Sequence, residues 1–412
     1  MKNCMNDNKK LNQKEFREQK IVLLSLPTRA WLAFTSRCNL RCTHCPRGAT
    51  NNQFLTSYDM DQEVFQRIED DLLPSLNLCR IGGNNLGEQL CCLKWDEYVK
   101  KMTKYALRPW LITNGLLLTR KRIKTLVEND FLIDISIDGA NAESYQRIRG
   151  ANFNKLINNV IEIDSQRKKH ENTNCQIAFA FTAFQENIKE LPDLIELAAQ
   201  IGVDKITTIH FMPMIEKQRL QSLFYHQTTA NNVFGHAKKM ADRLGIEILV
   251  PQAYPIHKLE NEEKKYIDSS KDLSAKKTPS HHRHIKQCYH PWTSVSINQR
   301  GDVFPCCQSN YYMGNLKKNT FKQIWNNKRY QKLRKTVNSD HPAKDCKECP
   351  LRGNTLTGTD CANNEYFLRN INKKGFFQLG KIEHLGIKAF LKDNVFTKSI
   401  YPLLSYFYKK IQ

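Results

Sequence analysis

The chain has 412 residues, of which 40% are apolar and 10% aromatic, so it can bury a hydrophobic core and global disorder is excluded. It has no apolar run of about 18 residues and its N-terminal segment is polar and charged, which argues against a membrane span and a secretory signal. We therefore expect a cytoplasmic protein of two or three domains, whose 14 cysteines are metal ligands or buried thiols rather than disulfides.

Positive charge is concentrated toward the C-terminus. The net charge of +22 divides into +6 over residues 1–250 and +16 over residues 251–412. A basic C-terminal third is typical of proteins that face nucleic acid, an anionic lipid surface or an acidic substrate, and a lysine-rich solvated surface gives the same composition. Residues 363–412 are also aromatic, which suits either peripheral membrane contact or a terminal helix packed on the rest of the protein.

Residues 1–250 alternate short apolar runs with patterns of helical period. The runs predict strands at 30–35, 78–81, 110–112, 132–137, 176–182, 205–211 and 247–250. The helical patterns cover 59–73, 98–107, 123–129, 142–148, 153–167, 191–201 and 231–244. Such alternation predicts an α/β fold with a parallel sheet and helices outside it, either a barrel or an open doubly wound sheet. In both architectures functional groups gather on loops at the carboxyl ends of the strands.

Three cysteines follow the first predicted strand within one short segment. Cys38, Cys42 and Cys45 have the spacing Cys-x3-Cys-x2-Cys, and we call residues 38–45 the thiol loop. Three thiolates on one loop can converge on a soft metal centre. A zinc site needs a fourth ligand, for which His44 is the local candidate. A [4Fe–4S] cube held by three thiolates leaves one iron open to a substrate or cofactor. Three ordinary buried thiols are the remaining alternative.

The thiol loop, Cys38-Asn39-Leu40-Arg41-Cys42-Thr43-His44-Cys45, resembles the signature loop of the radical S-adenosylmethionine (SAM) superfamily. The resemblance implies a partial (β/α)6 TIM-like barrel and a [4Fe–4S] cluster on the three loop cysteines. It implies that SAM binds the open iron and is cleaved reductively, and that the resulting 5′-deoxyadenosyl radical abstracts a hydrogen from a substrate. It also implies an external reductant such as flavodoxin or ferredoxin.

Two further segments resemble the elements that hold the methionine end of the cofactor. Gly87-Glu88 is similar to the element after the second strand that binds the methionine amino group, and Gly82-Gly83 is the competing assignment. Arg149 resembles the arginine that meets the cofactor carboxylate. The residue types suit these roles, because Glu88 can accept from an ammonium and Arg149 can donate two hydrogen bonds to a carboxylate.

The nucleoside end of the cofactor is matched by residues after the fourth strand and in the thiol loop. Ser136-Ile137-Asp138-Gly139 is similar to the ribose-binding segment, so Ser136 and Asp138 are expected to bond ribose hydroxyls. Asp138 also reads as an ordinary turn residue in an Asp-Gly pair. His44 stands where the family commonly has an aromatic residue over the adenine, and an imidazole can still stack there.

A second set of cysteines lies in the C-terminal part: Cys288, Cys306, Cys346 and Cys349, which we call the auxiliary thiols. Four thiolates complete a cube or a zinc tetrahedron. The segment from Cys288 to Cys306, with Gly301 between them, resembles the SPASM/twitch auxiliary-cluster domain. Because only Cys361 follows the final Cys-x2-Cys pair, the resemblance implies one auxiliary [4Fe–4S] cluster that transfers electrons. Cys307 is the alternative ligand to Cys306.

The resemblance and composition divide the chain into five parts: an N-terminal extension (1–28), a radical SAM core barrel (29–250), a linker (251–285), a small Cys-rich α+β auxiliary-cluster domain (286–362) and a basic aromatic tail (363–412). We expect an oxidoreductase that oxidises or cross-links a peptide or a small polar metabolite. The alternative is a zinc-binding protein that binds nucleic acid through its basic C-terminal third. That alternative leaves Glu88, Ser136 and Arg149 unexplained, so nucleic acid is not the expected partner. The sequence names no catalytic acid or base.

Overall fold

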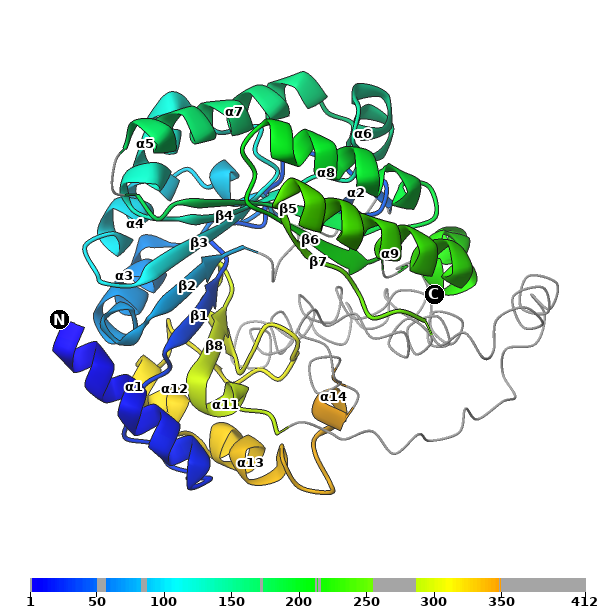
Figure 1. Ribbon diagram of the computed structural model, residues 1–412. Coiled ribbons are helices and arrows are strands. Elements are labelled where there is room, and N and C mark those ends of the chain that lie inside the picture. The colour runs from blue at the N-terminus through cyan, green and yellow to red at the C-terminus, as the bar shows by residue number, and fades with distance from the viewer. Residues whose placement is uncertain are drawn as a thin grey trace, which may run out of the picture.

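The computed structural model describes residues 2–49, 57–82, 87–170, 173–211, 213, 216–254, 287–347 and 349. Most of the predicted linker, all of the predicted tail, Gly83 and Cys361 lie outside these residues. The predicted strand–helix alternation is confirmed, and the helices lie outside a curved sheet (Figure 1). None of the described helices is long and apolar enough to cross a bilayer.

A single ten-stranded sheet runs through both halves of the described chain, in the order β10-β9-β8-β1-β2-β3-β4-β5-β6-β7. Strands β1 to β7 are parallel neighbours in sequence order, and β8 pairs with β1, also in parallel. Strands β9 and β10 are antiparallel. Their bounds are Arg29–Leu32 (β1), Leu78–Ile81 (β2), Arg108–Thr113 (β3), Leu132–Ser136 (β4), Gln176–Ala183 (β5), Lys205–His210 (β6), Glu247–Leu249 (β7), Ser294–Ile297 (β8), Asp302–Phe304 (β9) and Gly314–Asn315 (β10).

The helices fall into two groups (Figure 1). Those that cover the outer face of the parallel strands are α3 (Gln62–Asp71), α4 (Trp95–Met102), α5 (Arg120–Glu128), α6 (Ala142–Arg149), α7 (Phe153–Lys169), α8 (Leu191–Gln200) and α9 (Gln227–Leu244). Those at the β8 side are α1 (Lys2–Arg17), α11 (His290–Thr293), α12 (Phe321–Trp325), α13 (Lys328–Thr336) and α14 (Lys344–Lys347). The short α2 (Pro46–Ala49) follows the thiol loop, and a 3-10 turn at Gln89–Cys91 follows Glu88.

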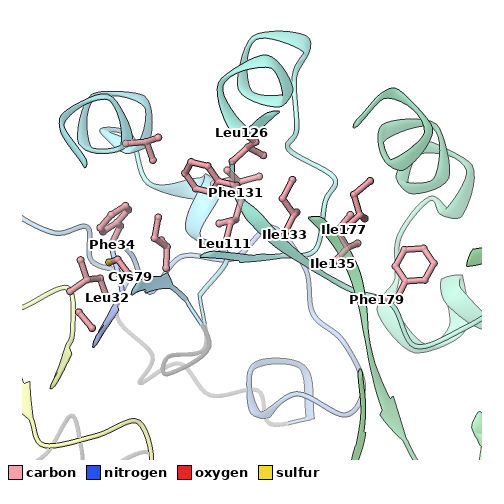
Figure 2. Close-up of a cluster of buried hydrophobic side chains, with 14 of the residues drawn as sticks. Leu32, Phe34, Cys79, Leu111, Leu126, Phe131, Ile133, Ile135, Ile177 and Phe179 are labelled. Carbon is pink, nitrogen blue, oxygen red and sulfur yellow. The ribbon is translucent and has the colours of Figure 1, made fainter. Parts of the chain in front are cut away.

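The hydrophobic core lies between the sheet and the outer helices (Figure 2). Side chains alternate along each strand, so Leu111 of β3 and Ile133 of β4 are buried under helices while Trp110 and Asp134 are only partly buried. We call the side of β1 to β6 that carries these partly buried residues the inner face. Full burial of a Leu or Ile side chain stabilises the fold by roughly 1.5–3 kcal/mol, so this core fixes the register of the sheet.

The N-terminal extension, in which no helix or strand was predicted, contains helix α1. The helix is polar, and its buried Asn12 amide donates to the Trp292 carbonyl at 2.6 Å and to the Ser25 hydroxyl at 3.0 Å. The buried Glu15 carboxylate accepts from the backbone N–H of Leu24 and Ser25. Apart from Met5 and Phe16, which are buried or packed against the core, polar side chains make the contacts of this helix, so hydrophobic periodicity does not reveal it.

Candidate functional site

The thiol loop begins just after β1 and is closed by backbone contacts. A Cβ at Gly48 would overlap the carbonyl oxygen of Cys42, so only glycine allows the chain to fold back this tightly. The Thr43 backbone N–H donates to the Ile148 carbonyl of α6 at 2.9 Å. The loop is thereby held against the C-terminal end of α6. The N-terminal end of the same helix is connected to β4 by residues 137–141.

The three loop thiols lie close enough to influence one another. Burial raises the pKa of each, that of Cys42 to about 11, and the charges of Cys38 and Cys45 raise the Cys42 pKa further. Backbone N–H groups offset part of this effect: Leu40 donates to the Cys38 sulfur at 3.4 Å, and those of Arg47 and Gly48 lower the pKa of Cys45. Grouped thiols with N–H donors aimed at their sulfurs are what an iron–sulfur cluster requires.

Glu88 is held beside the thiol loop as a buried carboxyl. The 87–89 segment approaches β1 so closely that a Cβ at Gly87 would overlap the Thr35 carbonyl oxygen. Three donors reach the carboxylate: the Thr113 hydroxyl at 2.8 Å, the Asn114 N–H at 2.6 Å and the Leu90 N–H at 3.1 Å. Burial raises the pKa of Glu88 and these donors oppose it. A carboxylate offers about four acceptor positions, so one remains for a further donor such as an ammonium.

Arg149, Asp138 and His44 form a buried charged group behind the loop. The Arg149 Nε and Nη2 atoms donate to Asp138 Oδ2 at 2.7 and 2.6 Å, and the Thr182 N–H donates to Oδ1 at 2.8 Å. His44 Nε2 lies 3.3 Å from Oδ2. Burial alone would lower the pKa of Arg149, but Asp138 raises it. Asp138 thus positions Arg149 and His44, and its expected role toward ribose stays a prediction.

His44 and Ser136 are the two remaining residues expected at the nucleoside end of the cofactor. The His44 ring is tilted against Phe184 at 5.8 Å and packs edge-on to Phe211 at 6.4 Å, and burial lowers its pKa. Ser136 is the last residue of β4, pairs with Ala180 and is partly buried on the inner face. His44 therefore belongs to a cluster with the buried Phe184 and Phe211, and the expected roles of His44 toward adenine and Ser136 toward ribose stay predictions.

Sequence reasoning missed Thr113, Asn114 and Tyr145. The first two lie at and just after the end of β3 and donate to the Glu88 carboxylate. Tyr145 of α6 has helical spacing and reads as core, yet its buried hydroxyl has no hydrogen-bond partner among the described residues. Burial raises its pKa to about 12, while the nearby Arg149 lowers it and the nearby Cys42 raises it. An unpartnered buried hydroxyl between Arg149 and the thiols is the feature expected where a polar cofactor binds, so the donor set fits a SAM-binding cluster.

The four auxiliary thiols line one cavity together with His290 and Asp345. Burial raises the pKa of Cys306 well above its usual range, and the charges of Cys288 and Cys349 add to this. Cys306 lines this cavity and Cys307 does not, which supports Cys306 as the ligand, although the charge of Cys307 also raises the Cys306 pKa. Over the described ranges no three His, Cys, Asp or Glu side chains are grouped for a single metal ion. A cube binds its thiolates through separate irons, so this donor set fits a cluster.

Two family models match the chain. The model of the radical SAM superfamily matches residues 32–223, and that of the SPASM iron–sulfur cluster-binding domain matches residues 288–350. The first match contains the thiol loop and the strand-end residues described above, and the second contains all four auxiliary thiols.

Similar proteins cover most of the chain at low identity. The tungsten-containing aldehyde ferredoxin oxidoreductase cofactor-modifying protein of Pyrococcus furiosus is 24% identical over 81% of this chain and 92% of its own length. The AdoMet-dependent heme synthase of Methanosarcina barkeri is 24% identical over 84% of this chain and 97% of its own length. The subtilosin biosynthesis protein AlbA of Bacillus subtilis is 24% identical over 84% of this chain and 70% of its own length.

Solved structures show the same fold. Streptococcus suis SuiB bound to S-adenosylmethionine has a TM-score of 0.56 at 13% identity, over 80% of this chain and 73% of its own. The structure of anSMEcpe with bound AdoMet has a TM-score of 0.53 at 18% identity, over 88% of this chain and 96% of its own. The chain belongs to the radical SAM superfamily and carries a C-terminal SPASM-type iron–sulfur cluster-binding domain.

Proposed function

We propose that the thiol loop of this chain holds a [4Fe–4S] cluster with SAM, and that the enzyme oxidises or cross-links a peptide or a small polar metabolite. The convergence of the three loop thiols, Glu88 and the buried Arg149–Asp138 pair at one edge of the sheet carries this proposal. When bound, cluster and cofactor supply reductive cleavage of the sulfonium and a 5′-deoxyadenosyl radical that abstracts a substrate hydrogen atom.

The residues around the thiol loop divide the task of binding SAM. Glu88 offers its remaining acceptor position to the methionine ammonium, and Arg149 offers the guanidinium N–H groups that Asp138 leaves free to the methionine carboxylate. The Tyr145 hydroxyl is a further donor within the same buried region. His44 and Phe184 provide ring surface for the adenine, and Ser136 provides a hydroxyl for the ribose.

The auxiliary thiols are proposed to serve electron transfer. A cube with four thiolate ligands has no open iron, so it does not bind substrate through the metal. Oxidation of a substrate radical releases one electron and one proton, and a second cluster is a suitable acceptor for that electron. External electrons are expected from a flavodoxin or ferredoxin, and the free thiols among the described cysteines suit a reducing cytosol.

Relatives give the substrate classes. AlbA is named for bacteriocin biosynthesis, and SuiB is described with its precursor peptide, whereas the Pyrococcus furiosus and Methanosarcina barkeri proteins are named for cofactor modification and heme synthesis. These names favour a peptide or a small polar metabolite for this chain. On the inner face, Ala178 and Ala180 of β5 pair in register with Asp134 and Ser136, so small side chains line this part of the barrel wall.

The test is reductive cleavage of SAM by the full chain, reconstituted with iron and sulfide under anaerobic conditions. We expect release of 5′-deoxyadenosine and methionine by the wild type, and none by a variant with all three loop cysteines changed to Ala. The matched control is Cys79→Ala, which removes a buried thiol from β2 of the same domain. Zinc without iron in the purified protein, or equal nucleoside release by the triple variant, would falsify the proposal.

A further inference from the structure

Three large polar side chains form one row across the inner face of the barrel. Trp31 of β1 pairs in register with Arg80 of β2, and Arg80 pairs in register with Trp110 of β3. Neighbouring residues in register on parallel strands point to the same side of a sheet, about 4.8 Å apart along the hydrogen-bonding direction. The row therefore places a guanidinium between two indoles.

The guanidinium is held by contacts that leave part of it unpaired. The Arg80 Cζ atom lies 4.2 Å above the Trp110 ring centroid, within the range of a cation–π contact. Its Nη2 atom lies 3.6 Å from Asp134 Oδ2, which is an ion pair but too long for a hydrogen bond. The side chains of Arg80 and Asp134 are only 29% and 15% exposed, so water screens this pair weakly.

The row presents three hydrogen-bond donors that have no acceptor. The Arg80 Nε, Trp31 Nε1 and Trp110 Nε1 atoms are shielded from solvent, and none of them meets a partner in the described ranges. Buried donors in folded proteins are almost always paired, and leaving them unpaired is costly. The Trp110 N–H lies near enough to the Asp134 carboxylate to favour its charged form, so of the three donors this one has a weak partner. Within the described residues, no acceptor completes a hydrogen bond to any of the three, so an added acceptor would be stabilised there.

A second arginine–tryptophan pair shows what a structural pair looks like in this protein. Arg122 lies over Trp95 at 5.2 Å on the helical side of the sheet. Its Nη1 atom donates to the carbonyls of Leu90 at 3.1 Å and Leu117 at 3.2 Å. The Arg122 guanidinium is thus satisfied by backbone oxygens, whereas the Nε atom of Arg80 has no partner in the described ranges. The Trp95 Nε1 atom is unpartnered like those of Trp31 and Trp110, so the two pairs differ in the guanidinium and not in the indole.

The location of the row points to the substrate rather than to the cofactor. Trp31 lies on the strand that leads into the thiol loop, and Arg80 lies on the strand that leads toward Glu88. Asp134 shares the inner face of β4 with Ser136. On the other side, the charge of Arg80 reaches Cys307 of the auxiliary domain. The row therefore lies on the barrel wall between the proposed SAM site and the auxiliary thiols.

We propose that Arg80, flanked by the indole N–H groups of Trp31 and Trp110, is a subsite for a carboxylate of the substrate. This inference rests on the proposed function, because it assigns the inner face to substrate. All three atoms are donors, and the guanidinium is only partly neutralised by Asp134 at 3.6 Å. A planar guanidinium edge matches the two oxygens of a carboxylate, and the ring faces exclude water from the contact.

The test is equilibrium dialysis of radiolabelled acetate against the reconstituted full chain, at constant ionic strength, with the isosteric neutral acetamide and with phosphate as comparisons. We expect acetate to bind at least about tenfold more tightly than acetamide. Arg80→Gln should weaken acetate binding about tenfold, and Trp31→Phe and Trp110→Phe each about threefold, since each removes one donor while keeping the ring. Arg122→Gln is the matched control and should leave binding unchanged.

Equal binding of acetate and acetamide, tighter binding of phosphate, or equal losses in Arg80→Gln and Arg122→Gln would each overturn the subsite. The two tryptophan variants keep the test decisive if Arg80→Gln does not fold. Wild-type enzyme that cleaves SAM but binds no acetate refutes the subsite alone. Enzyme that binds acetate but never cleaves SAM refutes the proposed function alone.

Discussion

The ion pair between Arg149 and Asp138 allows a quantitative prediction of stability. In Asp138→Asn, the neutral amide keeps the shape of the side chain but removes the charge that two Arg149 N–H groups contact at 2.6 and 2.7 Å. Asp138 is wholly buried and the Arg149 side chain is 7% exposed, so solvent cannot replace the lost partner. Leaving one member of a buried pair uncompensated costs about 3–5 kcal/mol.

The assay is urea unfolding followed by circular dichroism under anaerobic conditions, with Glu186→Gln as the matched control. Glu186 pairs with Arg147, which lies on the same helix two positions before Arg149, at a similar distance of 2.6 Å. That pair is exposed, with side chains 49% and 32% accessible, and such pairs contribute about 1 kcal/mol or less. We expect a large loss for Asp138→Asn and a small one for Glu186→Gln. Equal losses would refute the claim that burial makes the Asp138 pair different.

Three further predictions concern the clusters and the core. Changing all three loop cysteines to Ala should lower iron from about eight to about four atoms per chain, measured by chemical iron analysis, while Cys79→Ala leaves it unchanged. Cys306→Ala should abolish the auxiliary cluster signal in electron paramagnetic resonance and Cys307→Ala should retain it; the reverse result would make Cys307 the ligand. Burial lowers the pKa of His210 to about 4 from 6.5, so the unfolded chain takes up its proton at higher pH than the folded one. Unfolding free energy should therefore fall by up to about 3 kcal/mol between pH 6.5 and pH 4, and His210→Phe should remove that part of the pH dependence.

The order of the barrel elements was predictable because its pattern is strong. Leu78–Ile81 was placed to the residue, and the strand predicted at 30–35 starts one residue earlier, at Arg29, and stops three residues earlier, at Leu32. It stops there because the Phe34 N–H donates to the Gln89 side chain at 2.7 Å rather than to a neighbouring strand, and Thr35 then forms an isolated bridge with Asp59. Such end effects depend on segments far apart in sequence, which local periodicity does not report.

The sequence predicted which residues belong to the site, but not the hydrogen bonds and ion pairs between them. The spacing of the three loop thiols is local, so the sequence shows it directly. The partnership of Asp138 with Arg149 and His44 joins three segments, and the expected role of Asp138 toward ribose was drawn from its place alone. Tyr145 carries no signal that separates it from a core residue, because only its unpartnered hydroxyl marks it.

The pairing of β8 with β1 bears on electron transfer between the two proposed clusters, because it joins the barrel and the auxiliary domain in one sheet. Strand β1 leads into the thiol loop, and β8 follows α11, which begins two residues after Cys288. Leu32 of β1 pairs with Ile297 of β8, and Ala33 donates to the same residue at 3.0 Å, so the register ties the two strands together. A strand slipped by one residue would turn its buried side chains outward, which makes the register costly to change. The separation between the two proposed cluster sites is therefore set by a continuous sheet rather than by the mutual docking of two domains.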